Sequence, residues 1–156
     1  FMDRKEAYRI AIEAEMRSQM LYNALAKSFR MPETSVVFQE LVILERNHEE
    51  KVRDAFATEF AGIEMLTEPE LNVDLRSINL KDPKEVLDFA ITREELAQSI
   101  YLDLAESSAD ADLKALFERF AEEEDQHKTI LLTEIQRMQG ALEWYDPSEL
   151  NGMMEE

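Results

Sequence analysis

The four-residue pattern Glu-x-x-His occurs twice in this chain, and both copies lie in the register of an internal repeat. The first copy runs from Glu45 to His48 and the second from Glu124 to His127, an offset of 79 residues (127 − 48 = 79). Two further pairs repeat at this offset, Glu15 with Glu94 and Tyr22 with Tyr101. Both histidines of the chain belong to the pattern. Carboxylates and imidazoles placed twice in one register are what a two-metal site inside a helical bundle requires.

The rest of the sequence predicts four amphipathic helices. Few residues interrupt a helix, since the 156-residue chain has three glycines and four prolines. Apolar residues recur at spacings of three and four over about residues 3–29, 33–60, 82–106 and 110–140. The third helix has the clearest start, because Asp82-Pro83-Lys84-Glu85 supplies an N-cap residue, a first-turn proline and an acidic third residue.

The connections predict how these helices are joined. The links at 30–33 and 107–110 are short, so the helices on either side of each link should form antiparallel hairpins. Residues 61–82 form a longer link that can reach roughly 70 Å when extended, whereas a helix of about 26 residues is roughly 39 Å long. The sequence therefore predicts an all-α four-helix bundle with one long crossover between the second and third helices. We assign the bundle to residues 1–140 and expect one short helix in the tail, residues 141–156.

Composition argues against several classes of function. The net charge of −18 disfavours binding to nucleic acid or to an anionic membrane surface. The chain has no cysteine, which excludes disulfides, thiolate metal sites and iron–sulfur ligation. No apolar run approaches the roughly 20 residues of a membrane span, and the N-terminus lacks the apolar stretch of a signal peptide. We therefore expect a cytoplasmic protein that binds neither nucleic acid nor membrane.

Six residues of metal-binding type fall at positions of the helical stripes where apolar residues are expected. A buried carboxylate without a partner is destabilising by several kcal/mol, and no Lys or Arg occupies the stripes beside these residues. Two divalent ions would supply the missing positive charge. We therefore predict a two-metal site, with a metal-free bundle containing ordinary polar core residues as the alternative. The predicted metal-binding residues are Glu15, Glu45, His48, Glu94, Glu124 and His127.

Two further carboxylates and two tyrosines are candidates for supporting roles. Glu95 and Glu123 neighbour predicted ligands, but neither has a carboxylate at the equivalent position of the repeat, so they are alternatives as extra or switching ligands. Tyr22 and Tyr101 lie two turns after the carboxylates of the first and third helices. A buried tyrosine needs a hydrogen-bond partner, and so does a ligating carboxylate. We therefore place both tyrosines in the catalytic site as hydrogen-bond partners of the ligands, with plain core packing as the alternative.

The ligand types favour iron. Carboxylate-rich sites with one imidazole per ion and no sulfur suit Fe or Mn, and Zn can bind as a substitute. Four carboxylates neutralise two divalent ions without remainder. That arrangement leaves open coordination positions for oxygen or peroxide, so we predict two iron ions as the cofactor.

With these residues in place, the chain resembles the rubrerythrin branch of the ferritin-like di-iron superfamily over roughly residues 5–138. The resemblance rests on the long link and on four motifs, Glu15-x6-Tyr22, Glu45-x2-His48, Glu94-x6-Tyr101 and Glu124-x2-His127. It implies a ferritin-like fold and a di-iron centre that reduces hydrogen peroxide, oxidises iron or stores it. The chain departs from the family in two ways. It has no cysteines for a rubredoxin domain, and Ala97 stands where rubrerythrins place a second carboxylate in the third helix.

Three functions fit this resemblance. The first is a di-iron oxidoreductase acting on peroxide or oxygen, in which the carboxylates of the two Glu-x-x-His patterns bridge the ions and the other two are terminal ligands. It requires an external electron-donor protein. The second is non-catalytic iron binding or storage, and the third is a structural bundle that metal stabilises. Because the tail carries apolar residues such as Trp144 and Leu150, we also expect a homodimer, with a monomer as the alternative.

Overall fold

The computed structural model describes residues 3–29, 31–69 and 82–142, which form four helices and parts of their links. Helix α1 spans Arg4–Ser28, α2 spans Pro32–Glu59, α3 spans Pro83–Glu106 and α4 spans Ala111–Leu142. These boundaries lie within two residues of the predicted ones, and the described ranges contain no strand. None of these four helices is long and apolar enough to cross a membrane. The predicted all-α class is confirmed, whereas the predicted tail helix lies outside the described residues.

Local chemistry sets where helices begin and end. The carboxylate of Asp82 accepts hydrogen bonds from the backbone N–H groups of Lys84 (3.1 Å) and Glu85 (3.4 Å), which makes it the N-cap of α3 as predicted. Beyond the end of α2, Gly62 has a φ of +82°. Glycine adopts this left-handed conformation without steric cost, so the chain can turn there from the helix into the crossover.

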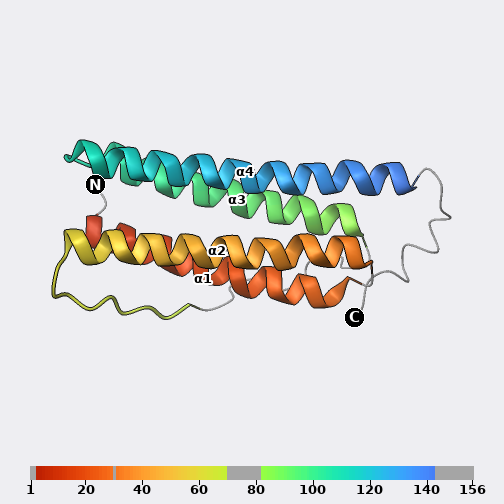
Figure 1. Ribbon diagram of the computed structural model, residues 1–156, viewed down its shortest axis with the longest axis horizontal. Coiled ribbons are helices and arrows are strands. Elements are labelled where there is room, and N and C mark those ends of the chain that lie inside the picture. The colour runs from red at the N-terminus through yellow and green to blue at the C-terminus, as the bar shows by residue number, and fades with distance from the viewer. Residues whose placement is uncertain (1–2, 30, 70–81, 143–156) are drawn as a thin grey trace.

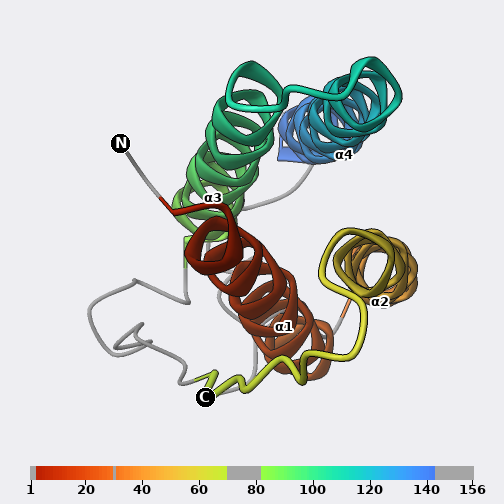
Figure 2. The ribbon, with the colours of Figure 1, turned by 90° about the vertical axis from the view of Figure 1, so that its left-hand side faces the viewer.

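The helices lie side by side in one bundle (Figure 1). Helices α1 and α2 form one antiparallel pair and α3 and α4 form another, while α2 and α3 run in the same direction. Residues 61–69 leave the end of α2 and run back along the bundle, as the predicted long crossover requires. Viewed from the end, α3 lies over α1 and α4 lies over α2, and these pairs are also in contact (Figure 2). Each helix therefore presents one face to a shared interior.

Two apolar clusters fill the interior, one towards each end of the bundle. The first includes Leu25, Phe38, Leu41, Leu87 and Leu131. The second includes Tyr8, Ile12, Phe56, Phe117 and Phe120. Burying one such side chain contributes about 1.5–3 kcal/mol. The two clusters hold the helices together on both sides of a polar layer at mid-height, which is where the predicted site lies.

Candidate metal centre

Six buried polar side chains meet in the polar layer between the apolar clusters. Helices α1 and α3 each contribute one carboxylate. Helices α2 and α4 each contribute a Glu and a His, and the i, i+3 spacing places both side chains on one helix face. Each of the six residues is at most 4% exposed. They are the residues predicted from the sequence: Glu15, Glu94, Glu45, His48, Glu124 and His127.

These side chains form two overlapping groups, each of which could hold a metal ion. In each group, four potential ligand atoms lie within 4.8 Å of one another. Glu45 and Glu124 belong to both groups. The first group is completed by Glu15 and His48, and the second by Glu94 and His127. The arrangement thus contains two shared carboxylates, and each group adds one carboxylate and one imidazole of its own.

Both imidazoles turn Nδ1 towards the carboxylates. His48 Nδ1 lies 2.7 Å from Glu124 Oε1 and 3.3 Å from Glu15 Oε1. His127 Nδ1 lies 3.0 Å from Glu45 Oε1. The centroids of the two rings are 5.4 Å apart. In both groups Nδ1 is therefore the ring nitrogen placed to bind an ion.

Each of the two tyrosines donates a hydrogen bond to a carboxylate from the other half of the repeat. Tyr22 of α1 donates a hydrogen bond to Glu94 Oε1 of α3 (2.5 Å), and Tyr101 of α3 donates one to Glu15 Oε1 of α1. Burial, and then the negative charge of the accepting carboxylate, raise the pKa of each hydroxyl well above its ordinary value. Both hydroxyls therefore keep their protons, and each orients the carboxylate that belongs to the other half of the repeat.

The carboxylates also retain buried acceptors without partners. No Lys or Arg of the described ranges forms an ion pair with them, and a buried acceptor left unsatisfied is destabilising by about 1–3 kcal/mol. The unpartnered atoms are Oε2 of Glu15, Glu45, Glu94 and Glu124. Divalent cations take such oxygens as ligands, and four carboxylates balance two of them. The donor set therefore fits two metal ions.

In the absence of cations the cluster has to bind protons. Burial, and then the charge of Glu15, raise the pKa of Glu45 and Glu124 well above the ordinary value. Burial lowers the pKa of His127, but hydrogen bonds with the neighbouring carboxylates outweigh it and raise the pKa to about 9. The pKa of His48 is raised in the same way. Protons then take the place that divalent ions would fill.

The two alternative ligands lie outside both groups. Glu95 is exposed and pairs with a lysine of α4 at 3.6 Å. Glu123 contacts Nε2 of His48, the ring nitrogen on the far side from the cluster. It does not pair with His127 on its own helix, although the i, i+4 spacing would allow that. The repeat gives no signal for the observed contact, because the position equivalent to Glu123 holds Leu44.

Ala97 contributes no ligand to the cluster. It is buried, with 6% of its surface exposed, and lies three residues after Glu94 on the same face of α3. An alanine methyl group at this position offers no ligand atom to a metal ion. The two groups consequently have the same composition, with three carboxylates and one imidazole in each.

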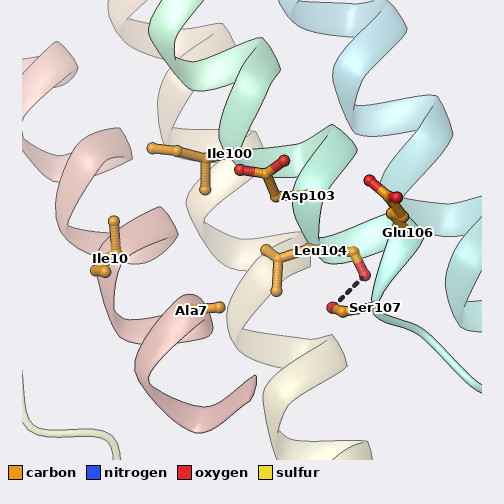
Figure 3. Close-up of a pocket in the computed structure, with 7 residues that line it drawn as sticks. All are labelled: Ala7, Ile10, Ile100, Asp103, Leu104, Glu106 and Ser107. Carbon is orange, nitrogen blue, oxygen red and sulfur yellow. Dashed lines mark hydrogen bonds between the residues drawn. The ribbon is translucent and has the colours of Figure 1, made fainter. Parts of the chain in front are cut away.

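A surface groove lies apart from the six-residue cluster. It has a volume of about 400 Å³ and is lined by Ala7, Ile10, Ile100, Asp103, Leu104, Glu106 and Ser107. Figure 3 shows that the first two residues come from α1 and the others from α3 and its C-terminal end. We call it the α1–α3 groove. Its lining combines apolar residues with the acidic Asp103 and Glu106, and it shares no residue with the candidate metal centre.

Fold and site together define a ferritin-like four-helix bundle with a carboxylate–histidine cluster suited to two metal ions. A hypothetical protein from Pyrococcus furiosus has the same fold, with a TM-score of 0.75 and 24% identity over 93% of this chain and 94% of the other. A protein from Thermotoga maritima, described as a candidate ferritin-like diiron-carboxylate protein, gives a TM-score of 0.68. It is 26% identical over 85% of this chain and 93% of its own.

The family is shown by the sequence as well. The family model described as Rubrerythrin matches residues 6–80 and 85–153. The chain therefore belongs to the rubrerythrin family. Among curated proteins, none matches the chain.

Proposed function

We propose that this protein is a di-iron carboxylate oxidoreductase that acts on peroxide or oxygen. The observation that carries the proposal is the pair of overlapping ligand groups, whose four carboxylates each keep one buried oxygen without a partner. The proposal is supported by membership of the rubrerythrin family and by likeness to the Thermotoga protein described as a diiron-carboxylate candidate. Carboxylate-rich sites with one imidazole per ion suit iron.

Each of the six residues has a proposed role that follows from its place in the two groups. Glu45 and Glu124, which belong to both, would bridge the ions. The carboxylates of α1 and α3 would each bind one ion as terminal ligands. Each imidazole would bind one ion through Nδ1, the nitrogen that faces the carboxylates.

The surrounding residues prepare the site for two-electron chemistry. Two ferrous ions held there would supply the two electrons that, with two protons, convert hydrogen peroxide to two water molecules. Tyr22 and Tyr101 hold the terminal carboxylates by hydrogen bonds. The ring of Phe120 packs against His48 at 5.2 Å between centroids, and the second apolar cluster beyond it excludes water from that side. Each turnover consumes two electrons, so an external electron-donor protein is part of the proposal.

A single-turnover experiment tests the reaction. The metal-free protein is loaded anaerobically with two ferrous ions per chain and mixed with one equivalent of hydrogen peroxide in a stopped-flow spectrometer. We expect rapid oxidation of both ions with one peroxide consumed per pair. Slow oxidation, together with uptake of iron well beyond two ions per chain, would support the alternative of iron storage. If two ions bind but react with neither peroxide nor oxygen, the proposed oxidoreductase activity would be contradicted.

Metal binding should release protons and strengthen as pH rises. In the metal-free cluster the pKa of His127 is raised to about 9, so this imidazole is protonated at pH 7, and the pKa values of Glu45, Glu124 and His48 are also raised, so these groups hold their protons more strongly. An ion can bind only after these protons leave. Calorimetric zinc titrations in buffers of different ionisation enthalpy should therefore show that protons are released as the ions bind. Affinity should still be rising between pH 7 and pH 8, and a flat profile there would contradict the proposed ligands.

We also propose that the chain forms a homodimer through the α1–α3 groove. Leu96 is 52% exposed and lies one turn before Ile100, so the apolar surface of the groove continues along α3. Replacing Leu96 with Glu is expected to shift the protein to monomers in light scattering while leaving two ions per chain. Leu132→Glu, at a similarly exposed leucine of α4, is the matched control and should remain dimeric. A monomeric parent protein at micromolar concentration would refute the dimer.

A further inference from the structure

The two halves of the repeat differ at one position beside the metal centre. The 79-residue offset pairs Glu123 of α4 with Leu44 of α2. Glu123 contacts His48 Nε2 through one oxygen, and Lys51 Nζ lies 3.5 Å from the other oxygen. Leu44 is apolar and packs against the first apolar cluster. The six predicted ligands therefore follow the repeat, but the residues that contact those ligands from outside do not.

The contact with Glu123 decides which nitrogen of His48 carries the proton. A neutral imidazole has one N–H, and its other nitrogen offers the lone pair that binds a metal. Because Nδ1 faces Glu124 and Glu15, the proton belongs on Nε2, from where it is donated to Glu123. A carboxylate in this position fixes the tautomer and ring orientation of the imidazole and makes its free nitrogen a better ligand.

His127 has no equivalent support. Its Nδ1 lies between 3.0 and 3.5 Å from oxygens of Glu45, Glu124 and Glu94. In the part of the chain that the structure describes, no side chain accepts a hydrogen bond from its Nε2. The two imidazoles thus enter the cluster in the same way, but only one is held from behind by a charged partner.

We propose that Glu123 is a positioning residue that makes the two metal positions unequal, so that the position of Glu15 and His48 binds its ion first and more tightly than the position of Glu94 and His127. This inference rests on the proposed metal centre. It predicts that the protein loads its ions in two separable steps. A state with one ion, held on the His48 side, then exists at intermediate metal concentration.

Zinc titration of the metal-free full chain tests the inference, since zinc binds such ligands without redox chemistry. The parent protein should show two steps whose dissociation constants differ by about 10–100-fold, the usual effect of such a partner. Glu123→Leu gives the His48 side the residue found on the other side, and it should weaken the tight step until the two steps merge. Glu95→Leu is the matched control. Like Glu123, Glu95 is next in sequence to a predicted ligand and pairs with a lysine, but it contacts no imidazole. This variant should leave both steps unchanged.

A second readout reports the imidazoles directly. The chain has two histidines, so ¹⁵N spectra of the zinc-loaded protein contain two imidazole spin systems, assigned with His127→Ala. We expect a slowly exchanging Nε2–H for His48 in the parent, and faster exchange of that proton in Glu123→Leu. Glu123→Gln keeps the shape and an acceptor, and should lie between the two if the leucine variant is unstable. Two equal steps in the parent, or a tight step that survives both substitutions, would overturn the inference alone. No zinc binding by the parent would overturn the proposed function as well.

Discussion

Replacing Glu124 with Ala is expected to empty both metal positions, whereas replacing His127 with Ala should empty one. Glu124 belongs to both ligand groups, while His127 belongs to one. Removing one partner of a buried charged group typically costs about 3–5 kcal/mol. A loss of this size in metal binding would lower both binding constants of Glu124→Ala by more than about 100-fold. Elemental analysis after loading and desalting should give close to zero ions per chain for Glu124→Ala and close to one for His127→Ala.

Glu134→Gln supplies the control for this comparison. Glu134 is also a buried glutamate of α4, 4% exposed, but it is bonded to Thr34 and Arg137 and lies outside both groups. The Gln variant should lose some stability and still bind two ions. If Glu124→Ala retained one tightly bound ion, Glu124 would not be shared between the two positions. The division into bridging and terminal carboxylates would then be wrong.

Removal of metal should lower the melting temperature by more than about 15 °C. A ligand present at about a thousand times its dissociation constant stabilises a protein by about 4 kcal/mol for each site. For a chain of this size, 1 kcal/mol shifts the melting temperature by about 2–4 °C. Two sites together stabilise the protein by about 8 kcal/mol, which corresponds to the expected drop of more than about 15 °C when the metal is removed. Thermal unfolding of metal-free and zinc-loaded protein, followed by circular dichroism at 222 nm, measures it.

The same carboxylates should destabilise the protein when no metal is bound. Replacing a buried ionic cluster with apolar residues of similar size is often stabilising, by about 1–4 kcal/mol. The double variant Glu45→Leu and Glu124→Leu should therefore melt at a higher temperature than the metal-free parent and show no response to zinc. A variant less stable than the metal-free parent would mean that these carboxylates stabilise the bundle through contacts of their own.

The sequence alone determined the fold class and the set of residues that meet at mid-bundle. Helix positions followed from apolar spacing, and the ends followed from local signals such as Asp82, which caps α3 in the structure. The spacings Glu45-x2-His48 and Glu124-x2-His127 place each pair on one helix face, whatever the neighbouring helices do. The offset of 79 residues then brings both halves to the same height in the bundle. Periodicity carries this information because it depends only on residues of the same helix.

Contacts between helices were decided by the tertiary structure. The repeat places Tyr22 on the helix of Glu15, yet its hydroxyl donates to Glu94 of α3. The spacing on α4 would allow Glu123 to pair with His127, yet it contacts His48 of α2. Such pairings depend on how far each helix is rotated about its axis and how closely two helices approach. Those quantities arise from the packing of all four helices at once, and no spacing within a single helix encodes them.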